Sequence, residues 1–227
     1  MLNHQSEGSL PSSQSKEVSL LALWFFPMQA PLQPISSNEQ AWALELSGKR
    51  LREYQHSRGY IRVALSQLWE TPALKIPLYA PPGQSPQLAK GLGYVSISHC
   101  CDALFIGWSP KRIGVDIERM DRMFNPEKLV QRYFSQKEIG SLIGLEKEDL
   151  RIATLESWVN KEAAIKWQQA SLAGNISEWI FYKNSNLMFH ESLGYEIGLH
   201  RIRHDEWCIA IAYDQELHSD PPIFCLN

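Results

Sequence analysis

The stretch YVSISHCCDALFIGWSPKRIGVDIE, residues 94–118, contains three short runs of strand-forming residues. These runs, 94–98, 104–108 and 113–118, are separated by Cys-Cys-Asp and Ser-Pro-Lys-Arg, which favour turns. Short connections join antiparallel neighbours, so the stretch predicts an antiparallel meander of three strands.

The third run ends in GVDIE, residues 114–118, and carries two acidic side chains. Because side chains alternate along a strand, Asp116 and Glu118 lie on one face, and Val115 and Ile117 lie on the other. Two carboxylates on one face can hold a hard cation such as Mg²⁺, which prefers oxygen ligands. The alternative for so short a motif is that both carboxylates point into solvent at a strand end.

The sequence WVNKEAAIK, residues 158–166, predicts a helix with a chemically active side. Trp158, Glu162 and Lys166 are spaced i, i+4 and i+8, so they share one stripe, and Lys161 lies beside it. A third carboxylate and two ammonium groups suit a site that binds both a metal ion and phosphate groups. The alternative is an exposed ion pair between Glu162 and Lys166, with Trp158 in the core.

Basic residues earlier in the chain are candidates for binding an anion. The sequence SISH, residues Ser96, Ile97, Ser98 and His99, predicts a polar turn at the end of a strand. A single His is more often structural than functional, and most basic residues on a helix form a solvated face. The basic residues of the first helices are Lys49, Arg50, Arg52, Arg58 and Arg62.

The first half predicts helices followed by strands. An apolar run at 18–26 predicts a buried strand that is too short to cross a bilayer. Ser37 or Asn38 can cap a helix, and a second helical stretch follows at 60–68. Prolines then predict a loop over 71–93.

The second half repeats this order. Pro126 lies near the start of one helix, Ser135 and Glu138 match a capping box at the start of another, and a long helix covers 155–169. The chain then predicts strands at 179–182, 187–190, 195–202 and 208–213. Two halves with helices before antiparallel strands predict an α+β protein of two similar subdomains.

Composition excludes several classes of protein. With 227 residues, 44% of them hydrophobic, the chain can form a real core. Its formal net charge of -3 argues against nucleic-acid binding, so an anionic ligand needs a local basic cluster. The four cysteines include no C-x-x-C pair, which indicates neither a zinc site nor a disulfide framework and favours the cytoplasm.

Four motifs in order, S-H, G-V-D-I-E, F-S-x-x-E and W-x-x-K-E-A-x-x-K, resemble the Sfp-type 4'-phosphopantetheinyl transferase family. The resemblance covers about residues 37–215. It implies an enzyme that transfers the 4'-phosphopantetheine group of coenzyme A to a serine of an apo acyl or peptidyl carrier protein, or of a carrier domain of a synthase. The products are holo carrier protein and 3',5'-ADP. The smaller holo-ACP synthase type has similar motifs but about half this length.

The resemblance also implies a fold and a domain organisation. The fold is α+β, with two pseudo-symmetric subdomains that each pack helices on a small antiparallel sheet. We expect a disordered leader at 1–17, an N-terminal subdomain at 18–112 and a C-terminal subdomain at 113–227, with the active site in the cleft between them. The protein is expected to be a cytoplasmic monomer that binds neither nucleic acid nor a membrane.

Carried over residue by residue, the resemblance assigns roles in the site. Asp116, Glu118 and Glu162 are implied ligands of Mg²⁺, or of Mn²⁺, and Glu162 and Lys161 are implied catalytic residues. Contacts to coenzyme A are implied for five residues, with the pyrophosphate near the two lysines and the 3'-phosphate near the arginine and histidine. These five are Arg58, Ser98, His99, Lys161 and Lys166.

The chain departs from the family pattern in one place. The family often has G-K-P before the S-H turn, whereas this chain has Gly83, Gln84, Ser85 and Pro86. A lysine contact near the nucleotide is therefore missing. The family's carrier contacts fall between the two metal motifs, where Lys128, Arg132 and Lys137 accompany three aromatic residues; an ordinary amphipathic helix explains these residues equally well.

Two other functions are consistent with parts of the pattern. A non-catalytic module that binds coenzyme A or a carrier protein would be favoured by loss of a metal carboxylate, but all three are present. Another Mg²⁺-dependent phosphotransferase would be favoured by a phosphate-binding G-x-x-x-x-G-K-[ST] motif, and the sequence contains none.

Overall fold

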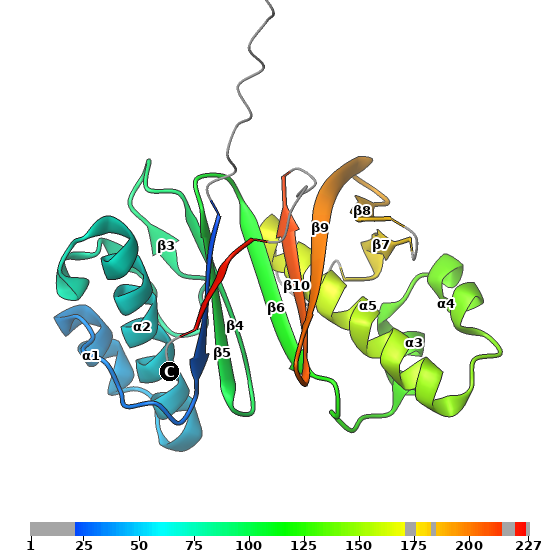
Figure 1. Ribbon diagram of the computed structural model, residues 1–227, viewed down its shortest axis with the longest axis horizontal. Helices are drawn as coiled ribbons and strands as arrows, with labels where there is room; N and C mark the ends of the chain where they lie inside the picture. The colour runs from blue at the N-terminus through cyan, green and yellow to red at the C-terminus, as the bar shows by residue number, and fades with distance from the viewer. Residues whose placement is uncertain (1–20, 171–175, 183–184, 215–220, 226–227) are drawn as a thin grey trace, which may run out of the picture.

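The computed structural model describes residues 21–170, 176–182, 185–214 and 221–225. Two sheets pack face to face, and each carries one long helix on its outer face (Figure 1). The fold class is therefore α+β, as predicted. The expected leader, 1–17, lies outside the described residues.

The first sheet has four strands in the order β11, β1, β5 and β4. Its strands are β1 (Ala22–Pro27), β4 (Tyr94–Cys100), β5 (Ala103–Ser109) and β11 (Ile223–Cys225). Strand β11 pairs in parallel with β1, so the end of the chain returns to the sheet of the first half. The division of the chain at 112 and 113 stays a prediction.

Two helices and a small hairpin accompany the first sheet. Helix α1 (Ser37–Ala43) is capped by Ser36, one residue before the predicted cap, and α2 (Gly48–Trp69) packs on the sheet. The expected loop at 71–93 contains a 3-10 turn and two short paired strands, and is otherwise irregular as predicted. These short elements are η1 (Ala73–Lys75), β2 (Leu78–Tyr79) and β3 (Gln87–Leu88).

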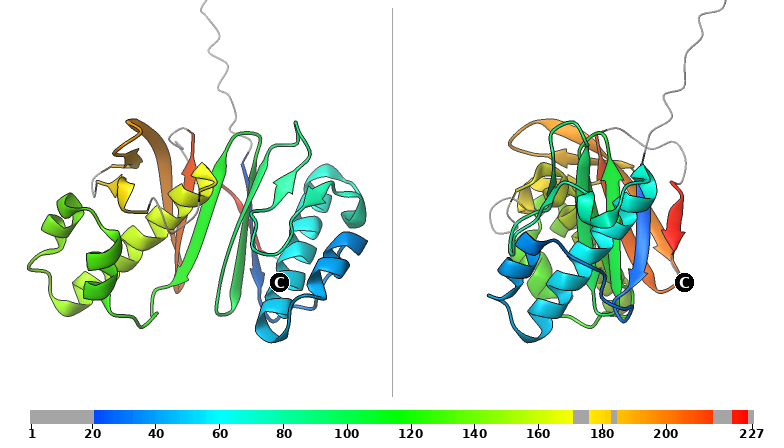
Figure 2. Two further views of the ribbon diagram at one scale, coloured as in Figure 1. Left: turned by 180° about the vertical axis from the view of Figure 1, so that it is seen from behind. Right: turned by 90° about the vertical axis from the view of Figure 1, so that its left-hand side faces the viewer.

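The second sheet has five strands in the order β6, β10, β9, β8 and β7, and helix α5 covers its outer face (Figure 2). The predicted strands of the second half are all present, with shifts of one or two residues at their ends. The strands are β6 (Ile113–Arg119), β7 (Trp179–Phe181), β8 (Leu187–His190), β9 (Tyr195–His204) and β10 (Trp207–Tyr213).

Two helices of the second half begin where the sequence predicted. Pro126 occupies the first turn of α3 (Pro126–Tyr133), and Ser135 with Glu138 forms the capping box of α4 (Gln136–Leu142). Helix α5 (Lys147–Gln168) begins earlier than expected, and it contacts both η2 (Ile176–Glu178) and β7.

The predicted meander is wrong in its last strand. Strands β4 and β5 pair in antiparallel register, but β6 pairs with β10 instead of β5. One edge of β5 is taken by β1 and the other by β4, so β6 packs on the face of β5. Gly107 allows this approach, because a Cβ atom there would stand 2.7 Å from Val115 Cγ1.

The long helix of each half is held by the same kind of buried ion pair. Helices α2 and α5 each have 22 residues, and each donates from a buried basic side chain to the glutamate of a capping box that precedes it by 23 residues. The pairs are Glu39 with Arg62 and Glu138 with Lys161. This recurrence supports the pseudo-symmetry expected of the two halves, which stays a prediction.

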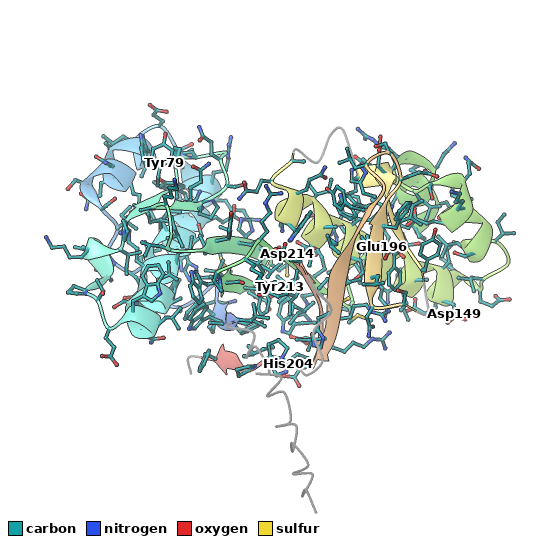
Figure 3. All side chains as sticks on the ribbon, turned by 90° about the horizontal axis from the view of Figure 1, so that it is seen from above. Tyr79, Asp149, Glu196, His204, Tyr213 and Asp214 are labelled. Carbon is teal, nitrogen blue, oxygen red and sulfur yellow. The ribbon has the colours of Figure 1, made fainter. Side chains whose placement is uncertain are left out.

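The interface between the sheets fixes the orientation of the GVDIE motif. Val115 and Ile117 point into the apolar core between the sheets. Asp116 and Glu118 therefore point to the opposite face of β6, the face covered by α5. Near the same interface, Ser109 Oγ lies 3.2 Å from the hydroxyl of Tyr213, which is labelled at the centre of Figure 3.

Candidate active site

The backbone of helix α5 packs directly against the backbone of strand β6 at Gly114. A Cβ atom at Gly114 would stand 1.9 Å from Ala163 O and 2.3 Å from Trp167 N, so only glycine fits here. This close approach brings side chains of α5 onto the face of β6 that carries Asp116. The glycine of the GVDIE motif therefore has a packing role that builds the site.

Asp116 and Lys166 form the centre of the site. Lys166 Nζ donates to Asp116 Oδ1 at 2.6 Å and lies 3.8 Å from Glu162 Oε2. Asp116 is only 2% exposed, and its other oxygen, Oδ2, is buried with no hydrogen-bond partner among the described residues. A buried carboxylate oxygen without a donor is costly, so a ligand is expected to satisfy it.

The three acidic groups influence one another. Burial raises the pKa of Glu162 to about 8, and the charges of Asp116 and Glu118 add to this rise. Burial also raises the pKa of Glu118 to about 7, although the paired guanidinium of Arg122 opposes the shift. The site therefore holds more acidic groups than its own cations neutralise.

These residues fit a divalent cation by their chemistry. Their oxygen atoms are the ligands that Mg²⁺ prefers, and Asp116 Oδ2 is free to coordinate. Within the described residues no three His, Cys, Asp or Glu side chains already converge as a metal cluster. The ammonium group of Lys166 lies where such convergence would occur, close to Asp116 and Glu162.

Two serines of β4 join the first half to this centre. Ser98 Oγ donates to Asp116 Oδ1 at 2.6 Å, and Ser96 Oγ accepts from Val115 N at 3.0 Å. Strands β4 and β6 belong to different sheets, so these side-chain bonds hold their edges together. Ser98 thus lies beside Asp116 within strand β4, not in the predicted turn, and its hydroxyl is engaged by Asp116.

A basic cavity of about 150 Å³ lies beside the site, between α2 and the end of β4. His99 and Arg58 both line it, so the structure brings together the two residues predicted to bind a phosphate. His99 is exposed, whereas Arg58 is 6% exposed and donates to Ala80 O at 3.0 Å. Burial lowers the pKa of Arg58.

The proline-rich segment connects this cavity to Lys166. Gly83 borders the basic cavity and also a second cavity of about 250 Å³. The second cavity is lined by Gln84 and Pro86 of this segment, by Lys166 of α5 and by Gln169, the C-cap of α5. A hollow of this extent can accommodate a ligand that carries separate phosphate groups.

The structure does not bring Lys161 to the carboxylates. Its side chain is completely buried, and its Nζ donates to Glu138 Oε2 at 2.8 Å, to Ile176 O at 3.1 Å and to Trp179 O. Consecutive helix residues point about 100° apart, so Lys161 leaves the helix toward α4 and β7 while Glu162 faces the site. Burial lowers the pKa of Lys161.

Three further residues belong to the site, and the sequence analysis did not single out one of them, Arg122. Arg50 lines the basic cavity, Arg122 pairs with Glu118, and Ser96 holds β6. Arg50 precedes Tyr54 and Arg58 at i, i+4 and i+8, a spacing that places all three on one side of a helix. The sequence could not show what Ser96 binds, because its partner belongs to another sheet.

The basic and aromatic residues around α3, where the resemblance places the contacts with a carrier protein, are only partly exposed. Phe134 is buried under Lys161, and Tyr133 packs against Trp158 with ring centroids 5.2 Å apart. Lys128 and Arg132 of α3 are exposed. The basic side chains are thus available, whereas the aromatic ones contribute largely to packing.

The match to known protein families falls on the second half of the chain. Residues 112–217 match the model of the 4'-phosphopantetheinyl transferase superfamily. The matched segment contains Asp116, Glu118, Glu162 and Lys166, and it supports phosphopantetheine transfer as the class of reaction. No protein of curated function matches the chain significantly. Among the described residues, no helix has both the length and the apolar character needed to cross a membrane.

Proposed function

We propose that this chain is an Sfp-type 4'-phosphopantetheinyl transferase, which transfers phosphopantetheine from coenzyme A to a serine of an apo carrier protein. The observation that carries the proposal is the buried Asp116, with one unpartnered oxygen, beside Glu162 and Lys166 and next to the cavity of Arg58 and His99. Carboxylates for a metal thus lie near basic groups for phosphates, as coenzyme A requires.

Asp116, Glu118 and Glu162 would hold Mg²⁺ or Mn²⁺. When bound there, the ion supplies charge neutralisation for the pyrophosphate and for the leaving 3',5'-ADP. Lys166 adds a mobile positive charge to the same side of the site, since it lines the second cavity. Ser98 and Gly114 keep Asp116 and α5 in position for this task.

Glu162 is the proposed general base. It accepts the proton of the carrier serine, directly or through one water molecule, as the serine oxygen attacks the phosphorus that carries pantetheine. The bond to the departing 3',5'-ADP oxygen breaks in the same step, so no covalent enzyme intermediate forms. Its buried position beside two other acidic groups raises its affinity for a proton, which suits this role.

The basic cavity is the proposed binding site of the 3'-phosphate. His99 and Arg50 face it with groups that can donate to an anion, while Arg58 mainly fixes the adjoining loop through Ala80 O. Gln84 replaces the lysine of the family pattern, so this chain relies on α2 and His99 for positive charge. We propose that Lys161 is a positioning residue and not a catalytic one, because its ammonium group anchors α5 to Glu138.

The partners follow from the reaction. Apo acyl or peptidyl carrier proteins, or carrier domains, are the proposed acceptors, and Lys128 and Arg132 offer exposed positive charge for their acidic surfaces. We further propose two pseudo-symmetric subdomains with the site between them, and a cytoplasmic monomer. The repeated pair of capping glutamate and buried cation supports the first of these.

The test is incubation of the purified protein with coenzyme A, Mg²⁺ and a panel of apo carrier proteins, followed by intact-mass measurement. Addition of one phosphopantetheine group that stops when the metal is chelated is the expected result. Coenzyme A binding without transfer to any carrier would instead indicate a non-catalytic binding module.

A further inference from the structure

We propose that Lys166 is an internal counter-cation, which occupies the carboxylate site until a divalent metal ion binds and then turns to the pyrophosphate. The inference rests on the proposed function, because it assumes that Asp116 and Glu162 bind a metal. It assigns Lys166 two successive partners instead of one.

The first observation is the position of the ammonium group. Lys166 Nζ lies 2.6 Å from Asp116 Oδ1 and 3.8 Å from Glu162 Oε2, so one cation contacts two of the three proposed metal ligands. Ser98 Oγ donates to the same oxygen at 2.6 Å. Asp116 Oδ1 is therefore saturated by protein donors, while Oδ2 has none among the described residues.

The second observation concerns charge. Asp116 is almost completely buried, and a buried carboxylate without a nearby cation is strongly unfavourable. Lys166 compensates Asp116, and Arg122 compensates Glu118 from the loop after β6. Two side-chain cations thus balance two of the three carboxylates, and a divalent ion can take the place of Lys166.

The third observation is that Lys166 has space to move. Its side chain is 25% exposed, and it lines the cavity of about 250 Å³ between α5 and the proline-rich segment. A lysine ammonium group is carried on a flexible four-carbon stem. Since a bound metal repels the ammonium group, the stem can place it in this cavity, where the phosphates of coenzyme A are expected.

Metal binding in the absence of coenzyme A tests the exchange. Mn²⁺ is titrated into the full chain, and the free ion is measured by electron paramagnetic resonance. Lys166→Met removes the competing cation, so it should tighten Mn²⁺ binding by about tenfold or more, the worth of a charge-assisted hydrogen bond. Unchanged or weaker binding would overturn the inference.

Two further variants separate competition from general electrostatics. Lys166→Arg keeps the positive charge and should bind Mn²⁺ within a few-fold of wild type. Lys147→Met makes the same substitution at the other end of α5, where the side chain is exposed, and should leave the affinity unchanged. Equal tightening by Lys147→Met and Lys166→Met would also overturn the inference.

A measurement on the wild-type chain does not depend on the folding of any variant. Lysine acetylation by acetic anhydride is followed by peptide mass spectrometry with and without Mn²⁺. Lys166 should become more reactive when Mn²⁺ is added, because its nitrogen leaves the two carboxylates, whereas Lys147 should not change. No increase at Lys166 under saturating Mn²⁺ would contradict the exchange.

The outcomes distinguish the inference from the function on which it rests. If wild type and Lys166→Met bind Mn²⁺ equally well, the metal site stands and only the exchange is wrong. If neither binds Mn²⁺ while carrier proteins are still modified, the assigned metal ligands are wrong, and the exchange fails with them.

Discussion

Lys161 Nζ lies 2.8 Å from Glu138 Oε2, and the lysine side chain is completely buried. The same glutamate caps α4 by accepting from Ser135 N at 2.9 Å. One carboxylate therefore fixes the start of α4 and the middle of α5. The relationship gives Lys161 a structural role in a motif that resembles a catalytic one.

We predict that Lys161→Ala lowers the free energy of unfolding by about 3–5 kcal/mol, because Glu138 would remain buried without its cation. Urea denaturation measures the loss. Lys147→Ala, at the exposed start of the same helix, serves as the control and should change stability by less than about 0.5 kcal/mol. If the Lys161→Ala protein has normal stability but cannot transfer phosphopantetheine, Lys161 is a catalytic residue and the structural role is wrong.

Gly114→Ala should destabilise the protein and weaken coenzyme A binding together. The added Cβ atom would meet Ala163 O and Trp167 N, so α5 must move away from β6 at a cost of about 1–3 kcal/mol or more. Thermal melting and calorimetric titration with coenzyme A measure the two effects.

Gly140→Ala is the matched control for this substitution. Gly140 lies inside α4, and a Cβ atom there meets nothing within 4 Å. Alanine should therefore stabilise the protein by about 0.5–1 kcal/mol through its helix propensity. Equal melting temperatures for the two variants would contradict the close packing of α5 on β6.

Glu162→Gln should abolish transfer without loss of stability. The amide has nearly the same shape as the carboxyl, and it removes an acidic group whose pKa is raised by burial and, to a smaller extent, by the charges of Asp116 and Glu118. Intact-mass assays measure transfer, and urea denaturation measures stability. Glu146→Gln, at the exposed N-cap of α5, should retain activity. Near-normal turnover by Glu162→Gln would remove it from the mechanism.

His99→Ala should mainly raise KM for coenzyme A and should affect dephospho-coenzyme A much less. His99 lines the basic cavity as an exposed side chain, so its loss removes one contact to a phosphate and little packing. Steady-state kinetics of wild type and variant give the change in KM for coenzyme A and for dephospho-coenzyme A. The 3'-phosphate assignment fails if the variant discriminates between them as strongly as wild type.

His56 should make the protein less stable in acid. It is completely buried, with Nε2 3.1 Å from Pro27 O, and Nδ1 has no hydrogen-bond partner among the described residues. Burial lowers the pKa of His56 below 6.5, and the charges of Arg52 and His99 lower it further. The unfolded chain therefore binds a proton more readily, and stability falls as the pH drops below about 6.5.

The difference between wild type and His56→Gln isolates this contribution, since other titrating groups are common to both. Glutamine stays neutral and can still donate to Pro27 O. From pH 7.5 to 5.5 wild type should lose stability relative to the variant, with a slope of up to about 1.4 kcal/mol per pH unit. A constant difference in urea denaturation across this range would show that His56 does not titrate differently in the two states.

The sequence by itself determined most of the longer helices and strands and the face on which the acidic residues lie. Alternation along 113–118 places Asp116 and Glu118 opposite Val115 and Ile117, and the structure has this arrangement. Pro126 and the Ser135 capping box were also local signals, because each acts within one helical turn. Periodicity and capping depend on neighbouring residues, so they can be read without the fold.

Only the tertiary structure decided which strands pair and where the buried charges point. Strand β6 pairs with β10 instead of β5, its neighbour in sequence, because both edges of β5 are already paired with other strands. Gly107 has no side chain, so β6 can pack on the face of β5. Lys161 and Lys166 belong to one helical motif, yet Lys161 pairs with Glu138 and Lys166 pairs with Asp116. The partners of a buried cation lie far away in the sequence, and packing alone selects among them.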